Sequence, residues 1–237
     1  MTLVFPMAGL SRRFSEAGYA VPKYMLPLAS DTCFDRSVAG FAAAYPARDM
    51  VFVMQAAFDT PAFVAARLAA LGLTAARSVV LDGPTAGQAE TVERGLDEAG
   101  DGELAIFNID TFRAGYARPE FAGRVDGYLE TFVGEGDGWS FVADDGAGCR
   151  RVARTTEKVR ISNLCSTGFY QFARVDDFRT ALAAERASPS CPELYVAPLY
   201  NHLIAAGGDV RYTVIDRAEV TFCGVPAEYE ALMAQGA

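Results

Sequence analysis

Short apolar runs alternate with longer segments of helical periodicity along the first half of the chain. The runs are rich in β-branched and aromatic residues, which is typical of buried strands, and the longer segments have the apolar spacing of amphipathic helices. We predict strands beginning at Leu3 and at 50–55, 78–81 and 104–108, with helices at 37–45, 60–71 and 89–98. This alternation predicts an α/β fold with a mainly parallel central sheet and α helices on both faces, in which ligands bind at the carboxyl ends of the strands.

The pattern changes after the glycine-rich segment 134–138, where short strands are separated by turns and then followed by helices. We predict strands at 139–143, 150–153 and 168–172 and helices at 175–186, 195–206 and 228–233. No linker or repeat divides the chain, so residues 1–237 are expected to form a single domain.

Composition excludes several classes of function. A formal net charge of −9 argues against nucleic acid as a partner, because a nucleic-acid footprint needs a basic face. No apolar run is long enough to cross a membrane and no basic region precedes the first one, so we expect no membrane association and a cytoplasmic location. The five cysteines include no C-x-x-C pair, and a single histidine, His202, makes most zinc sites and histidine-dependent triads improbable.

A small cationic loop follows the first predicted strand. It is formed by Ala8, Gly9, Leu10, Ser11, Arg12 and Arg13, and Lys23 follows shortly after it. Glycine admits close approach of the backbone to an anion, arginine supplies planar paired donors, and Pro22 stiffens the segment that carries Lys23. The loop therefore predicts a phosphate site, although a strand-to-helix turn with solvated arginines is the alternative.

Further polar groups lie where later strands end. Gly83, Thr85, Gly87 and Gln88 open a helix after the strand at 78–81, and the amide of Gln88, or less strongly that of Gln55, can pair with the edge of a base. A capped helix start with turn glycines explains the same segment.

Asn108 and Asp110 close the strand at 104–108, so Asp110 is expected to project into the ligand crevice. A carboxylate that only caps the following loop is the alternative. Farther along the chain Glu157 and Lys158 form a pair that by itself fits a solvated ion pair, and Thr167 and Gly168 begin a Thr-Gly-Phe-Tyr segment.

Together these segments resemble the sugar-phosphate nucleotidyltransferases, or nucleotide-sugar pyrophosphorylases. The resemblance rests on 6–14 with Pro22-Lys23, on 81–89, Asp110, Glu157-Lys158 and 167–170, and on a closing Gly224-Val225-Pro226. It covers nearly the whole chain and implies the Rossmann-like nucleotide-diphospho-sugar transferase fold, with nucleotide bound by about 1–134 and the acceptor by about 135–237. The implied reaction joins an NTP to a phosphorylated acceptor, expected to be a sugar 1-phosphate, and releases pyrophosphate.

The resemblance also implies a role for each candidate residue. Arg13 and Lys23 would neutralise phosphate charge, Asp110 would hold Mg²⁺, and Lys158 would meet the acceptor phosphate. The residues expected to bind nucleotide are Ala8, Gly9, Leu10, Ser11, Arg12, Arg13, Lys23, Gln55, Gly83, Thr85, Gly87 and Gln88, and those expected to bind the acceptor are Asn108, Glu157, Lys158, Thr167 and Gly168.

The chain departs from the family pattern at both ends. Ser11 replaces a glycine, Arg12 a small hydroxyl residue, and Phe222 the usual second metal carboxylate, for which Asp216, Glu219 or water are substitutes. Two alternatives therefore stay open, a nucleotide-sugar-dependent glycosyltransferase and a non-catalytic nucleotide-binding relative. The sequence leaves the base, the acceptor and any homo-oligomer undefined.

Overall fold

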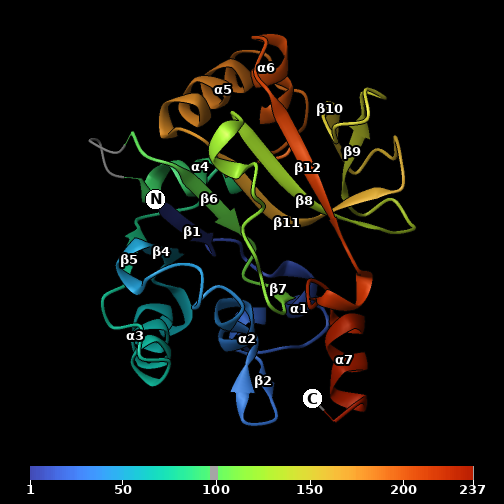
Figure 1. Ribbon diagram of the computed structural model, residues 1–237. Helices are drawn as coiled ribbons and strands as arrows, with labels where there is room; N and C mark the ends of the chain where they lie inside the picture. The colour runs from blue at the N-terminus through green and yellow to red at the C-terminus, as the bar shows by residue number, and fades with distance from the viewer. Residues whose placement is uncertain (97–100, 237) are drawn as a thin grey trace.

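The computed structural model describes residues 1–96 and 101–236. The described residues form a nine-stranded sheet at the centre of the molecule (Figure 1), in the order β10-β9-β11-β6-β1-β4-β5, with β8 also paired to β11 and β12 to β8. Its strands are β1 (Thr2–Pro6), β4 (Met50–Gln55), β5 (Arg77–Leu81), β6 (Leu104–Phe107), β8 (Gly127–Val133), β9 (Ser140–Asp144), β10 (Val152–Glu157), β11 (Leu164–Phe172) and β12 (Val210–Ile215).

The sheet is parallel in its first half and mixed in its second. Strand β1 pairs in parallel with β4 and β6, and β4 pairs in parallel with β5. Strand β11 is antiparallel to β6, β8 and β9, while β12 runs parallel to β8. The carboxyl ends of β1, β4 and β6 therefore meet at one edge, as the alternating pattern predicts.

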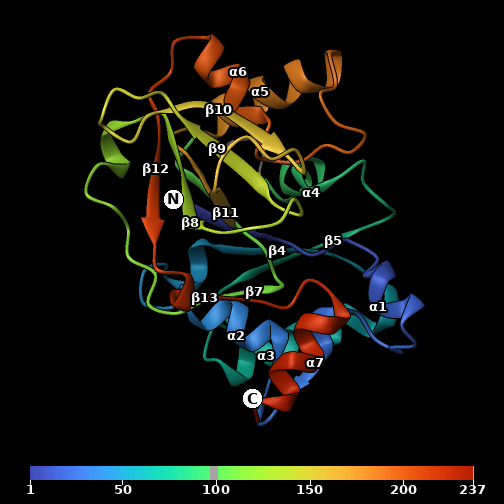
Figure 2. The ribbon, with the colours of Figure 1, turned by 90° about the vertical axis from the view of Figure 1, so that its right-hand side faces the viewer.

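Helices cover both faces of this sheet (Figures 1 and 2). One face carries α4 (Gln88–Gly95), α5 (Val175–Ala187) and α6 (Leu199–Ala205), and the other carries α2 (Cys33–Ala39) and α3 (Thr60–Ala70). Because successive residues of a strand point to opposite faces, Val4 joins the cluster under α4 to α6 while Leu3 and Phe5 join the cluster under α2 and α3. Because both faces of β1 are covered, its sequence is a continuous apolar run.

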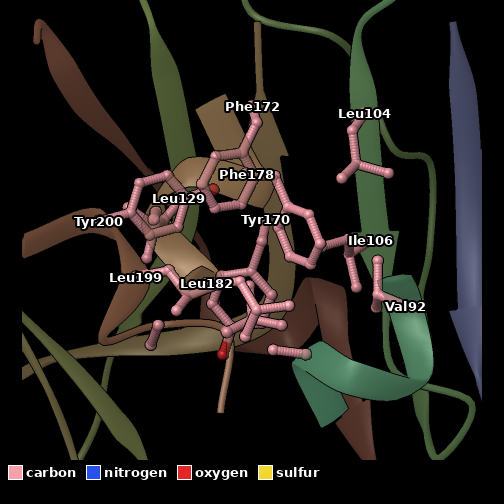
Figure 3. Packing of buried hydrophobic residues seen from close by; sticks show 14 of the residues in the cluster. Val92, Leu104, Ile106, Leu129, Tyr170, Phe172, Phe178, Leu182, Leu199 and Tyr200 are labelled. Atoms are coloured by element: carbon pink, nitrogen blue, oxygen red, sulfur yellow. The ribbon is translucent and has the colours of Figure 1, made fainter. Parts of the chain in front are cut away.

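The cluster under α5 and α6 is built on aromatic side chains of β11. The rings of Phe172 and Tyr200 stack at 4.5 Å between centroids, and Phe178 packs edge-on against Phe172 (Figure 3). The hydroxyl of Tyr200 donates to the backbone carbonyl of Gln171 at 2.8 Å, so this buried tyrosine is satisfied. The packing fixes β11, whose first half borders the site, against the helical layer.

A smaller cluster joins the two ends of the chain. It contains Phe14 of α1 (Arg12–Glu16), Cys33 of α2, Phe112 of β7 (Thr111–Arg113) and Tyr229 of α7 (Pro226–Ala234). The hydroxyl of Tyr229 donates to the carbonyl of Pro27 at 2.9 Å. The C-terminal helix is thereby held beside the N-terminal loop segment, on the same side of the sheet as α2 (Figure 2).

The remaining short elements are connections. They are β2 (Pro27–Leu28), β3 (Asp31–Thr32) and β13 (Val220–Phe222), and the 3₁₀ turns Lys23–Met25, Ala47–Asp49, Ala57–Asp59, Ala122–Arg124 and Arg217–Glu219. Among the described residues no helix is long and apolar enough to cross a membrane.

Several predicted boundaries are wrong. The helix predicted at 37–45 is α2 at 33–39, because Thr32 and Asp35 form a capping box that starts it four residues early. The helix predicted at 195–206 begins only at Leu199, after Pro198. The strand predicted at 150–153 is β10 at 152–157. The helix predicted at 89–98 is α4, which ends at Gly95, and positions 97–98 lie outside the described residues.

Two strands of the nine-stranded sheet were not predicted, β8 and β12. Strand β8 contains the charged Glu130, which interrupts its apolar pattern, yet Glu130 is buried because the Arg113 guanidinium donates to it at 2.8 Å. Strand β12 follows Gly207-Gly208-Asp209 and has only two fully buried positions, Val210 and Tyr212, so its apolar pattern is weak on its own.

Candidate active site

Two adjoining pockets form one cleft at the carboxyl edge of β1, β4 and β6. The first has a volume of about 740 Å³ and the second about 590 Å³. Volumes of this size suit small-molecule ligands. The residues that border both pockets are Lys23, Asn108, Asp110, Ser140, Glu157, Tyr170 and Tyr195.

The loop after β1 forms one wall of the first pocket through residues 8–12. Ser11 has a φ of 48°, in the left-handed region, and its hydroxyl accepts from the backbone N–H of Lys23 at 3.3 Å. A serine therefore occupies the position expected for glycine and contributes a contact of its own. Arg13 faces the second pocket rather than the first.

A lysine–carboxylate pair lies where the two pockets meet. Lys23 Nζ donates to Asp110 Oδ2 at 2.5 Å, and the two side chains are 25% and 19% exposed. Lys23 begins a 3₁₀ turn directly after the extended Pro22, and Asp110 comes from the turn between β6 and β7. Positions 87 residues apart in the chain are thus joined by charge, and partial burial strengthens that attraction relative to open water.

The loop before α4 forms another wall of the first pocket. A Cβ on Gly87, which has a φ of +154°, would lie 2.6 Å from backbone atoms of Leu194, so only glycine allows this approach. The Gln88 amide donates to Asn108 Oδ1 at 2.5 Å, and Thr85 and Gln88 line the pocket. Gly83, predicted to bind nucleotide, lines neither of the two pockets.

Gln55, at the end of β4, also borders the first pocket. Its Nε2 donates to the carbonyl of Ala8 at 2.9 Å, which ties the loop after β1 to the next strand. Because this hydrogen bond uses the amide nitrogen, the amide oxygen of Gln55 remains an acceptor.

The second pocket holds a largely buried carboxylate, 10% exposed, beside hydroxyl groups. Ser140 Oγ donates to Glu157 Oε2 at 2.5 Å and lies 3.0 Å from the Tyr170 hydroxyl. Burial raises the pKa of Glu157, against the opposing effects of the Ser140 hydrogen bond and the Lys158 charge. Such a network suits the recognition of ligand hydroxyls, which both donate and accept.

Lys158 adopts a φ of 55° and extends beside Tyr195. Its Nζ donates to the Tyr195 hydroxyl at 2.5 Å and lies 4.5 Å from the centroid of that ring. The nearer oxygen of Glu157 is 4.0 Å away, and the Lys158 side chain is 47% exposed. The ammonium is therefore positioned at the mouth of the second pocket and stays accessible to an anion.

Thr167 and Gly168 lie in the irregular middle of β11, which faces the second pocket. Gly168 has a φ of +90°, and a Cβ there would lie 2.3 Å from Nδ2 of Asn108. The Thr167 hydroxyl donates to Glu130 Oε1 at 3.2 Å. Gly168 therefore makes room for the side chain that also pairs with Gln88, linking the two pockets.

An aromatic group replaces the expected carboxylate at position 222. The Phe222 ring packs 4.5 Å from Trp139 and 5.3 Å from Phe132, and the Arg217 guanidinium lies 5.0 Å from its centroid. Asp216 and Glu219, the predicted substitutes, line neither pocket. They cap each other in the turn before β13, and Glu219 also accepts from Arg113.

Several cleft residues were missed by the sequence analysis. They are Ser140, Glu193, Tyr195, Trp139 and Glu228. None of them stands in a motif, since they reach the cleft through the pairing of β9 with β10 and through chain segments that return from far along the sequence. His202 borders neither pocket. Its Nε2 lies 2.8 Å from Glu185 Oε2, in a contact between α5 and α6. No cluster of three or more metal-ligating side chains occurs within the described part of the chain.

The fold and the site define an α/β protein of the nucleotide-diphospho-sugar transferase type. No protein-family model and no curated protein sequence matches the chain. Among solved structures, it is 42% identical to the nucleoside-diphosphate-sugar pyrophosphorylase from Vibrio cholerae RC9, over 99% of this chain and 100% of that chain, with a TM-score of 0.92. The chain belongs to this family of nucleotidyltransferases, and the class and fold predicted from the sequence are confirmed.

More distant structures share the fold alone. A putative glucose-1-phosphate thymidylyltransferase from Bacillus anthracis is 15% identical over 99% of this chain and 94% of its own, with a TM-score of 0.76. The inositol-1-phosphate CTP transferase from T. maritima is 13% identical over 99% and 95%, with a TM-score of 0.69.

Proposed function

We propose that the chain transfers a nucleotidyl group from an NTP to a phosphorylated acceptor, a sugar 1-phosphate, and releases pyrophosphate. The observation that carries the proposal is the Lys23–Asp110 pair at the junction of two pockets. A transferase of this kind must bring two anionic substrates together, so charged groups that reach both sites are the expected centre of the chemistry.

The nucleotide occupies the first pocket in this proposal. Its triphosphate lies along residues 8–12, where backbone N–H groups and Arg12 are available, and the base lies near Gln55 and Gln88. Gly9 supports this placement, because nothing lies within 4 Å of the position that a Cβ would take there, and a ligand can approach the backbone.

The acceptor occupies the second pocket. Glu157 accepts from sugar hydroxyls, and Lys158 and Arg13 meet the acceptor phosphate at the rim. An oxygen of that phosphate attacks the α-phosphorus of the NTP, the new P–O bond forms as the bond to pyrophosphate breaks, and pyrophosphate leaves on the opposite side. Positioning and neutralisation of charge drive the step, so no nucleophile from the protein is needed.

The residues around Asp110 fit a hard divalent cation such as Mg²⁺. Asp110 presents an oxygen to the cleft and already holds a cation, the Lys23 ammonium. A Cβ at Gly224 would lie 3.2 Å from Asp110 Oδ2, so the glycine leaves a space beside this oxygen. Magnesium needs only one or two carboxylates because phosphate oxygens and water complete its shell, and when bound it would neutralise the charge of the triphosphate.

The proposal is tested by pyrophosphate release from a grid of five NTPs against a panel of phosphorylated acceptors. We expect release only when a matching NTP and acceptor are both present. Asp110→Asn, which keeps the shape of the side chain and removes its charge, should abolish it. Transfer of sugar from a finished NDP-sugar, without pyrophosphate release in any pair, would instead identify a glycosyltransferase. Binding of NTP with no turnover in any pair would identify a non-catalytic relative.

A further inference from the structure

We propose that Glu228 supplies the second carboxylate of the cation site, in place of the carboxylate that the family motif has at position 222. The proposal rests on the proposed function and deepens it by naming a further ligand. The side chain of Phe222 has no oxygen to offer a cation, and its ring packs against Trp139 and Phe132. A second carboxylate at this site therefore has to come from another element that reaches the same place.

Glu228 reaches it from the first turn of α7. The position that a Cβ would take on Gly224 lies 3.2 Å from Asp110 Oδ2 and 3.7 Å from Glu228 Oε2. The two carboxylates therefore border one small space, and both line the second pocket. Magnesium keeps several of its waters, so a cation bound to Asp110 can meet Glu228 directly or through one of those waters.

The carboxylate of Glu228 is already oriented. Its Oε2 accepts from the backbone N–H of Gly224 at 2.8 Å and from that of Val225 at 3.2 Å. Among the described residues, no partner contacts Oε1. One oxygen is thus fixed by the backbone and the other is free, which is how neighbouring hydrogen bonds orient metal-ligating carboxylates.

Main-chain contacts join the two chain segments that carry Asp110 and Glu228. The N–H of Cys223 donates to the carbonyl of Asp110 at 2.8 Å, and Phe222 pairs with Thr111 in the antiparallel β13–β7 ladder. Glu228 follows this segment directly and caps α7. Main-chain hydrogen bonds therefore hold the segments that carry Asp110 and Glu228 next to each other.

A simpler role for Glu228 is to cap the helix and nothing more. Glu228→Gln separates the two roles, since the amide oxygen can accept the same N–H bonds while the charge is lost. A role limited to capping predicts little change in cation affinity, whereas a ligand role predicts a large one. The matched control is Glu230→Gln, two residues along the same helix, where an exposed carboxylate accepts from the Tyr19 hydroxyl and lines neither pocket.

The test is a Mn²⁺ titration of the full chain, in the presence of a non-hydrolysable NTP analogue that the parent binds, followed by the electron paramagnetic resonance signal of free Mn²⁺. We expect the dissociation constant for Mn²⁺ to rise about 10- to 100-fold in Glu228→Gln and to stay at the parental value in Glu230→Gln. Thermal unfolding of Glu228→Gln should stay close to that of the parent, which excludes a loss of fold as the cause.

The outcomes separate this inference from the proposed function. Parental Mn²⁺ affinity in Glu228→Gln, together with weakened affinity in Asp110→Asn, would overturn the role of Glu228 and leave the Asp110 site intact. Parental affinity in both variants would overturn the cation site as a whole. In the double variant Phe222→Asp with Glu228→Gln, recovery of Mn²⁺ affinity would support the proposal that Glu228 substitutes for the family carboxylate.

Discussion

Gly168→Ala adds one methyl group at the point where β11 passes the side chain that links the two pockets. The backbone there has a φ of +90°, and the new Cβ would lie 2.3 Å from Nδ2 and 2.8 Å from Cγ of Asn108. Holding a non-glycine residue in such a conformation costs about 1–3 kcal/mol. Asn108 must also rotate away, and this breaks the hydrogen bond from Gln88, at a further cost of about 1 kcal/mol.

The expected destabilisation is therefore about 2–4 kcal/mol, measured as the free energy of unfolding in urea at neutral pH. Gly123→Ala is the matched control, because its φ is not in the left-handed region and the nearest atom to an added Cβ is 4.0 Å away. In pyrophosphate release, Gly168→Ala should also raise the KM of both substrates, since Asn108 borders both pockets. A free energy of unfolding equal to that of Gly123→Ala, with unchanged KM values, would refute the reasoning.

Four other substitutions test the remaining parts of the account. Lys23→Ala should lower kcat about 100-fold or more and change the free energy of unfolding little. Near-parental turnover would show that Lys23 has no part in catalysis. Lys158→Ala should raise the acceptor KM or lower kcat, and calorimetry should find NTP affinity unchanged. Glu130→Gln removes the buried carboxylate that Arg113 contacts, while Arg113 keeps its ion pair with Glu219, and should destabilise by about 1–3 kcal/mol in urea. Burial raises the pKa of Glu157 above its ordinary value of 4.5, so the folded parent loses stability as Glu157 ionises with rising pH. The free energy of unfolding of Glu157→Gln in urea should therefore increase relative to that of the parent between pH 4 and pH 8.

The parallel half of the fold could be predicted because its signals are local. Strand β4 was predicted with its exact ends and α3 to within one residue, since each carries a full apolar pattern of its own period. Strand β8 could not be predicted in this way. Its buried Glu130 depends on Arg113, which precedes it by 17 residues, and a pattern of hydrophobicity does not report such a partner.

The site also has residues that local motifs predict and residues that only the folded chain brings in. The loop after β1, Lys23 and Asp110 stand in recognisable motifs at the ends of strands, and the structure brings them together at the cleft. Glu228 stands in no motif, because it becomes a neighbour of Asp110 only when β13 pairs with β7 and α7 folds back toward the N-terminal loop. Gly83 is the opposite case. It stands in the motif predicted to bind nucleotide, yet it borders neither pocket.

The direct test of nucleotidyl transfer follows the α-phosphorus itself. The chain is incubated with each NTP labelled with ³²P at the α-position, a phosphorylated acceptor and Mg²⁺, and the label is traced through the products while pyrophosphate is measured. The account predicts that the label moves into a phosphatase-resistant conjugate of the acceptor, with one pyrophosphate released per conjugate and no label on the protein. Label that stays in the NTP with every acceptor, or that becomes covalently attached to the chain, would contradict direct transfer between the two pockets.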